Sequence, residues 1–317
     1  MATLVTVGVP VYNAAAYLRE SLDSIRAQTY ENLEIIISDN ASTDATEEIS
    51  REAASVDRRI RYVRQPRNIG GGPNFAYVLD QARGEYFLWQ AHDDVRAPRA
   101  IESMVEALRT DAGAVSAVSD VRTMDAAGRD TGPSPFRAQL LDTPDVVRRL
   151  VALAEVSHNM AFYGLVRTAV ARSIPPLTDF INEDVRFTFE LAMRGRFAAV
   201  NAELFFCRMI NSDADYARQY VERSGGDYAL GRWRLFATAI ARGPLTAREK
   251  KAALEAVRAA IAPQMFRRAE HLLWSTPLSA ARLMRWARQF PPLLRRRSWW
   301  VAWRRLLSGS NSIGGSG

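Results

Sequence analysis

The 317-residue chain contains one cysteine, Cys207, and three histidines. A lone cysteine can form neither an internal disulfide nor a cysteine metal cluster, so a reducing compartment fits the composition. The first residues, "MATLVTVGVPVYN", lack the basic region, apolar core and cleavage site of a signal peptide. No window carries the long uncharged apolar run of a spanning helix. We therefore expect a cytoplasmic protein, with peripheral attachment to the inner face of the cell membrane as the further option.

Two common nucleotide-binding motifs are also missing. In "GGGPNFA", Phe75 stands where GxGxxG requires its third glycine, and no Lys-Ser/Thr pair of a P-loop follows. A dinucleotide dehydrogenase or a P-loop NTPase would lack its usual phosphate cradle. The formal net charge of +7 favours an anionic partner such as a phosphorylated substrate or an acidic membrane surface. We expect no nucleic acid partner, because no recognised binding module accompanies the charge.

Strand and helix patterns alternate along the first 120 residues. Helical spacing of apolar residues separates five short apolar stretches that read as strands, at 4–9, 33–37, 59–63, 85–89 and 114–118. This alternation predicts an α/β fold with a mostly parallel, Rossmann-like sheet flanked by helices. Pro10 is expected to stop the first strand.

The rest of the chain reads as loops and then helices. Residues 123–143 are rich in Gly, Pro, Asp and Thr and predict loops, whereas 144–155 and 162–174 predict helices. Residues 182–200 predict a helix that runs into a strand. We expect an α/β domain over 1–213, a helical, basic and Trp-rich C-terminal extension over 214–307, and a flexible tail over 308–317.

Polar residues follow several of the predicted strands. "VPVYN" closes the first, "SDNASTD" the second and "AHDD" the fourth, and "INEDVRF" comes later. Each has an ordinary explanation, as a turn cap, a solvated loop or a helix start. The carboxyl ends of parallel strands, however, meet at one crevice, where open α/β sheets bind ligands. Together, the motifs predict a single site there.

In this order the motifs resemble those of the inverting family 2 glycosyltransferases, which have the GT-A fold. "VGVPVYNAAAYLRESLDSIRAQTYENLEIIISDNASTDAT", "RNIGGGPNFAYVLDQARGEYFLWQAHDD" and "EDVRFTFELAMRGRF" carry the resemblance, which covers about residues 4–213. The family implies transfer of a sugar, with inversion, from a UDP- or dTDP-linked donor to a glycan or lipid-linked acceptor. Bacterial surface-polysaccharide assembly is the implied setting.

The resemblance also assigns the donor side of the site. It implies nucleotide contacts from Pro10, Tyr12, Asn13, Asp39, Asn68 and Asp93. Asp39 can accept a hydrogen bond from a base, and the ring of Tyr12 offers a stacking face, although Tyr12 can equally be a half-buried packing residue. Asp94 is implied as the ligand of Mn²⁺ or Mg²⁺, which prefer hard oxygen ligands. His92 and Arg208 are implied at the donor phosphates.

The metal motif departs from the family pattern, because Ala91 stands where many relatives have an acid. We therefore still expect a metal ion, but with one carboxylate fewer to bind it than in many relatives. Two other readings remain open: a metal-dependent nucleotidyltransferase, and a non-catalytic nucleotide-sugar-binding or scaffold protein.

The resemblance places the catalytic base in "NED". An inverting transfer needs a carboxylate that accepts the proton of the acceptor hydroxyl, and Asp184 is the candidate, with Glu183 as fallback. The first turn of a helix is expected to keep either acid ionised. Acceptor contacts are implied for His158, Asn159 and Tyr163.

The C-terminal region interleaves tryptophans with arginines between Trp274 and Trp303. Such a segment suits the plane of an anionic membrane. A helical cap packed on the catalytic domain, with a solvated basic face, explains the same pattern equally well.

Overall fold

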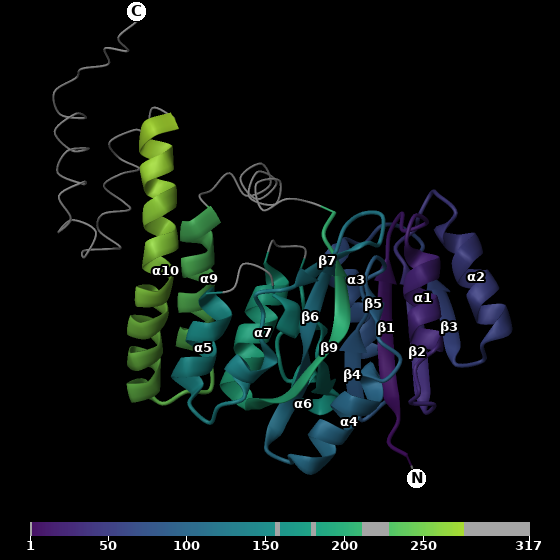
Figure 1. Ribbon diagram of the computed structural model, residues 1–317, viewed down its shortest axis with the longest axis horizontal. Coiled ribbons are helices and arrows are strands. Elements are labelled where there is room, and N and C mark those ends of the chain that lie inside the picture. The colour runs from purple at the N-terminus through teal and green to yellow at the C-terminus, as the bar shows by residue number, and fades with distance from the viewer. Residues whose placement is uncertain (1, 156–158, 179–181, 211–227, 276–317) are drawn as a thin grey trace, which may run out of the picture.

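A computed structural model describes residues 2–155, 159–178, 182–210 and 228–275. Within these ranges a nine-stranded sheet has the order β3-β2-β1-β4-β8-β6-β9-β5, with β7 beside β6 (Figure 1). Strands β1 to β4 are parallel, and β8 lies antiparallel between β4 and β6. The strands are β1 (Val5–Val11), β2 (Leu33–Asp39), β3 (Ile60–Arg64), β4 (Tyr86–Trp89), β5 (Val95–Arg96), β6 (Ala114–Met124), β7 (Asp130–Pro133), β8 (Leu165–Arg167) and β9 (Arg196–Arg208).

Helices cover both faces of this sheet, as the alternating pattern predicts. One core cluster joins α1, α2 and α4 to one face, and a second joins α3, α5 and α7 to the other. The helices are α1 (Leu18–Arg26), α2 (Thr46–Val56), α3 (Gly71–Asp80), α4 (Ala100–Thr110), α5 (Val146–Glu155), α6 (Thr168–Arg172), α7 (Glu183–Arg194), α9 (Tyr228–Arg242) and α10 (Ala247–Ser275), with 3₁₀ turns η1 (Ala138–Leu141) and η2 (Met160–Tyr163).

Strand β1 lies at the centre of the parallel part and continues through Pro10 to Val11. This extends the strand beyond the end predicted from the sequence. Its partner β4 pairs only as far as Gly8 opposite Trp89, so the missing N–H of Pro10 costs no ladder bond on that side. On the other side β2 accompanies β1 to its end, where Val11 lies opposite Asp39. The polar residues after β1 and β2 are thereby held side by side.

The sequence predicts one helix over 162–174, and this prediction is wrong. The segment instead contains the end of η2, strand β8 and the short helix α6. Leu165 and Val166 are both buried and belong to opposite core clusters, so successive side chains point to opposite faces, as in a strand. A Cβ on Gly164 would come 2.7 Å from the carbonyl of Ala117, which shows how closely this segment approaches β6. A three-residue strand is too short for its period to be read from sequence.

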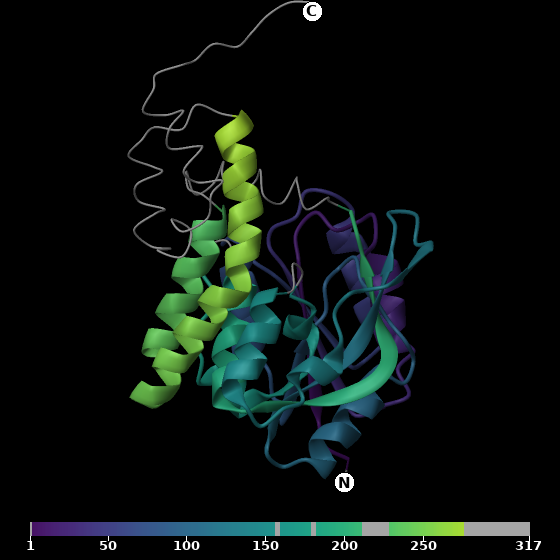
Figure 2. The same ribbon diagram turned by 60° about the vertical axis from the view of Figure 1, so that its left-hand side comes forward.

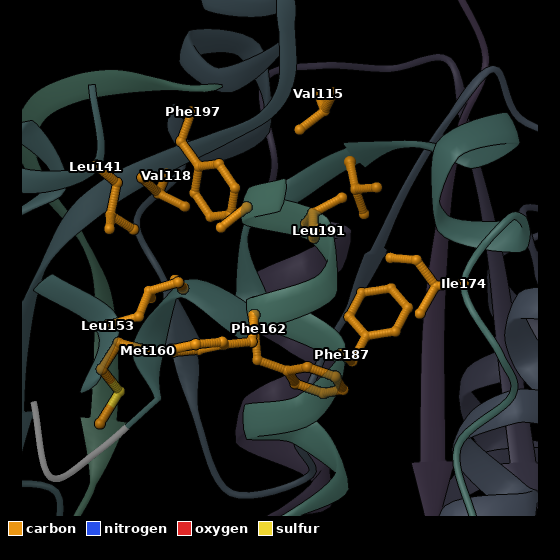
Figure 3. Packing of buried hydrophobic residues seen from close by; sticks show 14 of the residues in the cluster. Val115, Val118, Leu141, Leu153, Met160, Phe162, Ile174, Phe187, Leu191 and Phe197 are labelled. Atoms are coloured by element: carbon orange, nitrogen blue, oxygen red, sulfur yellow. The ribbon is translucent and has the colours of Figure 1, made fainter. Parts of the chain in front are cut away.

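Helices α9 and α10 pack against α5 and α7 (Figures 1 and 2). The ring of Phe236 in α9 stacks on that of Phe189 in α7, with centroids 4.2 Å apart. Val257 and Ile261 of α10 are buried in the same cluster. Figure 3 shows the part of this cluster around α7, where the rings of Phe162 and Phe187 lie with their centroids 5.8 Å apart.

The described part of the helical extension therefore shares a core with the α/β domain. Among the described residues, no helix combines the length and the apolar character needed to cross a bilayer. Most of the arginine- and tryptophan-rich stretch lies outside the described residues.

Candidate active site

The loops after β1 and β2 are joined by hydrogen bonds. The backbone N–H of Asn13 donates to Ser42 Oγ (3.0 Å), and the N–H of Thr43 donates to Asn13 Oδ1 (2.9 Å). Asn13 has a φ of 48°, a left-handed conformation that asparagine tolerates better than most residues. Tyr12, directly before it, is 47% exposed, so its ring is open to a ligand rather than packed in the interior.

Asp39, at the end of β2, is fully buried and already has several donors. Its Oδ1 accepts from the N–H of Ser42 (2.8 Å), and its Oδ2 accepts from Tyr62 Oη and Arg64 Nη1 (both 2.8 Å). Burial and the hydrogen bond to Asp39 raise the pKa of Tyr62 to about 12. Asp39 therefore fixes the β2 loop and Arg64 in place, and a nucleotide base at this position would share the carboxylate with these donors.

Asn68 lies on the neighbouring loop between β3 and α3. Its Oδ1 accepts from Asn40 Nδ2 and from the N–H of Gly70 (both 2.9 Å), while Asn40 Oδ1 accepts from the N–H of Ile69 (2.8 Å). The loop is thus tied to the end of β2. The structure places on adjacent loops of one sheet edge the residues predicted to hold the nucleotide base and ribose: Pro10, Tyr12, Asn13, Asp39 and Asn68.

The "AHDD" loop follows β4 along the same edge. Ala91 is buried, and its carbonyl accepts from Ser21 Oγ of α1 (2.8 Å), so the position without an acid is a packed wall. Asp94 is 3% exposed, and its Oδ1 accepts from the backbone N–H of Arg208 (2.8 Å). The side chains of His92 and Asp93 are more accessible, at 35% and 22% exposure. These two present the open polar atoms of the loop.

The carboxylates of Asp93 and Asp94 fit a divalent cation. Burial is the main cause that raises the pKa of Asp94 to about 7, and the negative charge of Asp93 adds to it. Within the described residues, no group of three or more His, Cys, Asp or Glu gathers as a metal site. Mg²⁺ in nucleotide enzymes commonly takes one or two carboxylates and completes its shell with phosphate oxygens and water. The pair fits a cation held jointly with a diphosphate.

Gln90 and Arg96 are buried and support the "AHDD" loop through hydrogen bonds. Gln90 Nε2 donates to the carbonyl of Asp94 (2.7 Å), and its Oε1 accepts from Arg96 Nε (2.8 Å). Arg96 Nη2 donates to the carbonyl of Tyr163 (2.8 Å), and its guanidinium lies 4.7 Å from the ring centroid of Phe205. Burial lowers the pKa of Arg96 to about 10, so the group remains charged at neutral pH. No sequence pattern indicates these roles, because a glutamine and an arginine beside "HDD" look like ordinary loop residues.

Asp184 and Glu183 begin α7 but have different partners. Both oxygens of Glu183 are bonded to Arg186, at 3.0 Å to Nε and 2.9 Å to Nη2. Asp184 is half-buried, with Asn159 Nδ2 3.4 Å from its Oδ2. Burial raises the pKa of Asp184 and outweighs the backbone N–H of Val185, which lowers it. The expectation that the helix start alone sets the ionisation of this acid is therefore incomplete.

An aromatic cluster connects the "AHDD" loop to the start of α7. Trp89, the last residue of β4, stacks on Phe162 with centroids 4.4 Å apart, and its ring meets that of Phe187 edge-on at 4.9 Å. Phe187 lies one turn after Asp184 on α7. The cluster is a rigid support between the predicted cation loop and the predicted base.

Tyr163, the last residue of η2, belongs to the same cluster, and its ring meets that of Phe162 edge-on with centroids 5.3 Å apart. Burial raises the pKa of Tyr163 well above 10, with smaller contributions from the charges of Asp94, Asp184 and Asp93. Asn159, which bonds Asp184 and Thr188, lies on the same side. His158 lies outside the described residues.

Arg208 has a different set of partners from the phosphate that the sequence predicts. Its side chain is 2% exposed, and Nη2 donates to Glu20 Oε2 of α1 (2.5 Å). Nε donates to the carbonyl of Asp93 (2.9 Å), and Nη1 donates to the carbonyls of Asp125 and Ala126 (both 3.3 Å). A phosphate could reach this guanidinium only by displacing protein acceptors.

The sheet is mixed rather than mostly parallel as predicted, because β5, β7 and β8 pair antiparallel with their neighbours. The acidic side chains and polar loops lie at the carboxyl edge of its parallel strands β1 to β4, where open α/β sheets bind ligands. The model of the family "Glycosyl transferase family 2" matches residues 6–174, and the chain belongs to this family. The match includes the loops from Pro10 to Asp94 and the residues Asn159 and Tyr163. It ends before Glu183, Asp184 and Arg208.

Curated relatives resemble only part of this chain. An uncharacterized glycosyltransferase of Rickettsia felis is 43% identical over 105 residues, which are 33% of this chain and 17% of that protein. Glycosyltransferase GlyA of Streptococcus pneumoniae is 43% identical over 90 residues, 28% of this chain and 13% of that protein. The chain thus matches less than a fifth of the length of these two relatives.

Solved structures resemble most of the chain. TarS residues 1–349 of S. aureus superpose with a TM-score of 0.66 and 19% identity, over 87% of this chain and 76% of that one. The mannosyltransferase PcManGT of Pyrobaculum calidifontis gives a TM-score of 0.54 and 19% identity, over 98% and 89%. At these identities the likeness concerns the fold, and it confirms the predicted GT-A fold.

Proposed function

We propose that the protein is an inverting glycosyltransferase that moves one sugar from a nucleotide-diphosphate donor to a hydroxyl of a glycan or lipid-linked acceptor. The observation that carries the proposal is that the Asp93–Asp94 loop follows β4 beside the loops after β1 and β2, while Trp89 at the end of β4 packs against Phe187, one turn after Asp184 on α7. A displacement at a sugar carbon needs positive charge to stabilise the leaving diphosphate and a base to take the proton of the attacking hydroxyl. The two acidic motifs supply one group for each.

Asp184 is the base in this scheme. Its carboxylate takes the proton of the acceptor hydroxyl while that oxygen bonds to C1 of the sugar. The bond from C1 to the diphosphate oxygen breaks, and its electron pair leaves with the nucleoside diphosphate. Burial raises the pKa of Asp184 toward the working range, which strengthens it as a base. Glu183 is less suited to this role, because both of its oxygens are bonded to Arg186.

The donor binds along the first three loops and the "AHDD" loop. Tyr12 offers its exposed ring to the base, while Pro10, Asn13, Asp39 and Asn68 shape the surrounding loops. Asp93 and Asp94 would hold Mn²⁺ or Mg²⁺ there, and the cation would supply positive charge to the leaving diphosphate. His92 faces the phosphates from the open side of the loop. Structures of TarS hold UDP or UDP-GlcNAc, and PcManGT holds GDP-Man and Mn²⁺, which supports a nucleotide-sugar donor without choosing its base.

The acceptor binds on the side of Asn159 and Tyr163, with His158 as a further predicted contact. Asn159 bonds Asp184 and Thr188, so it can orient the base as well as contact a sugar hydroxyl. Bacterial surface-polysaccharide assembly at a membrane surface is the setting we propose.

The first experiment is thermal unfolding of the whole chain with UDP, dTDP, GDP or CDP, each with Mn²⁺ or with EDTA. A ligand at a hundred times its Kd adds roughly 2.7 kcal/mol to the free energy of unfolding, a readable change in Tm. We expect one diphosphate to raise the Tm in Mn²⁺ and much less in EDTA. The matching nucleotide sugars are then assayed for release of nucleoside diphosphate in the presence of candidate acceptors.

The outcomes separate the competing functions. Release of nucleoside diphosphate with an inverted glycosidic product supports the proposal. Release of pyrophosphate from a nucleoside triphosphate and a sugar 1-phosphate, assayed in parallel, would instead indicate a nucleotidyltransferase. Stabilisation by a diphosphate without turnover of any donor sugar would indicate a nucleotide-sugar-binding protein.

A further inference from the structure

Arg208 occupies an unusual position for a residue next to a diphosphate site. It is the last residue of β9, its side chain is almost fully buried, and it carries a full positive charge. A buried arginine must find acceptors within the protein, because leaving its N–H donors unbonded is costly. Its partners therefore indicate what the residue does.

These partners come from three separate segments. The backbone N–H of Arg208 donates to Asp94 Oδ1 (2.8 Å), and Nε donates to the carbonyl of Asp93 (2.9 Å). Nη1 donates to the carbonyls of Asp125 and Ala126 in the turn between β6 and β7. Both carboxylate residues of the "AHDD" loop are thus bonded by the same residue.

The third segment is α1, directly after the predicted nucleotide loop. Nη2 of Arg208 donates to Glu20 Oε2 (2.5 Å), and the guanidinium carbon lies 4.6 Å from the ring centroid of Tyr17. Tyr17 is the N-cap residue of α1, and it lies a few residues after Tyr12 and Asn13 in the chain. One side chain therefore joins α1, the helix that follows the predicted nucleotide loop, to the cation loop.

From this geometry we infer that Arg208 is a positioning residue that locks the Asp93–Asp94 loop onto α1, and that it does not bind the donor phosphates itself. The inference rests on the proposed function, because it concerns the loop that would hold the cation and the diphosphate. Groups that orient metal ligands from behind typically change metal affinity by about 10- to 100-fold when removed.

The first test needs no ligand. Hydrogen exchange of the whole chain is compared between wild type and Arg208→Gln, with attention to the peptides that cover residues 90–96 and 124–128. We expect faster exchange in these peptides and unchanged exchange in β2 and α4. A general loss of protection across the sheet, or no change in residues 90–96, would overturn the inference.

Arg122→Gln is a matched control. Arg122, on β6, bonds Asp130 (2.5 Å) and Glu203 (2.7 Å), so it is also a well-paired arginine of this part of the sheet. Neither Asp130 nor Glu203 belongs to the "AHDD" loop. We expect this variant to leave exchange in residues 90–96 unchanged.

The variant Glu20→Ala tests whether Arg208 positions the loop or binds phosphate, because the two roles predict opposite changes in affinity for the diphosphate. Glu20→Ala removes one partner of Arg208 from a half-exposed position on α1. If Arg208 positions the loop, the variant weakens Mn²⁺-dependent binding of the nucleoside diphosphate by a few-fold and speeds exchange in residues 90–96. If Arg208 is a phosphate ligand restrained by Glu20, the variant frees it, and the diphosphate binds more tightly in EDTA as well as in Mn²⁺.

The same binding measurement is made with Arg208→Gln and Arg208→Lys. For Arg208→Gln we expect a loss of about 10- to 100-fold in Mn²⁺ affinity in the presence of the diphosphate. Lysine should restore little of it, because one ammonium cannot reach Asp93, the β6–β7 turn and Glu20 together. Full rescue by lysine would instead favour a simple charge contact with phosphate and overturn the inference.

The two proposals can fail separately. If wild type binds no nucleoside diphosphate and no Mn²⁺, the proposed function is overturned, while the exchange measurement still decides whether Arg208 locks the loop. If wild type binds both and Arg208→Gln binds them equally well, only the inference is overturned.

Discussion

Replacing Asp184 with asparagine keeps the shape of the side chain while removing its charge and its ability to take a proton. Asparagine can still accept the hydrogen bond from Asn159 Nδ2 through its own Oδ1, so the local geometry is preserved. A positioned general base typically contributes about 10²- to 10⁴-fold to a rate. We expect Asp184→Asn to lower kcat by an amount in this range, with donor binding unchanged.

The same substitution should not weaken the fold at neutral pH. Burial raises the folded-state pKa of Asp184 above its ordinary value of 3.8. The folded state therefore holds this proton more tightly than the unfolded state does, and the free energy of unfolding falls as the pH rises through the window between the two pKa values. Asparagine carries no charge and avoids this loss. The variant should gain stability relative to wild type as the pH rises from about 4, and should keep that gain above the raised pKa.

Glu183→Gln is the matched control, one residue earlier on the same helix turn. Glu183 accepts two bonds from Arg186 and one from the N–H of Thr178 (3.0 Å), and its side chain is 12% exposed. Loss of such charge-assisted hydrogen bonds costs roughly 1–3 kcal/mol. We expect this variant to be less stable than wild type at pH 7.5 and to retain most of its kcat.

The assay combines urea unfolding at several pH values with steady-state transfer. The reasoning predicts opposite results for neighbouring acids: Asp184→Asn is stable and inactive, whereas Glu183→Gln is destabilised and active. An Asp184→Asn enzyme with near-normal kcat would refute the base assignment. An Asp184→Asn protein that is less stable than wild type at pH 7.5 would refute the argument that burial disfavours this carboxylate.

Two further predictions concern the support of α7. Phe236→Ala should cost roughly 3–5 kcal/mol in urea unfolding, because it empties a fully buried site and removes the stacking on Phe189, whereas Phe236→Leu should cost less than about 1.5 kcal/mol. Asn182, the residue before α7, has a φ of 66°, a left-handed conformation. Asn182→Ala should therefore lower the free energy of unfolding by about 1–2 kcal/mol, and Asn182→Gly should lower it clearly less. Equal losses of stability in the two variants would show that asparagine is not needed there for its backbone conformation.

The sequence predicts the fold well where the hydrophobic period is long enough to read. The first four strands and the helices between them follow from apolar runs and helical spacing, and the structure confirms them to within a few residues. The sequence fails at β8, where the three residues Leu165–Arg167 form a strand because β4 and β6 lie on either side of them. Such pairing depends on tertiary neighbours rather than on local propensity.

The residues of the candidate site also fall into those that the sequence predicts and those that only the structure reveals. Motif position places Asp39, Asp94 and Asp184 on the correct elements, because acids after strands and at helix starts have a recognisable pattern. The supporting residues Gln90 and Arg96 have no such pattern, since their importance comes from being buried beneath a loop. A buried and an exposed arginine look alike in a sequence, so this part of the site needs the structure.

The predicted base lies on a helix that the family match does not reach, and the described C-terminal helices support it. The ring of Phe236 in α9 packs on α7, and the charge of Arg232, also in α9, lowers the pKa of Asp184 against the larger effect of burial. Arg232 Nη2 donates a hydrogen bond to the carbonyl of Ala154 at the end of α5 (3.4 Å), which links α9 to α5. The described part of the extension therefore supports, through packing and charge, the helix that carries Asp184, whereas every residue that we propose for donor binding lies in the α/β domain.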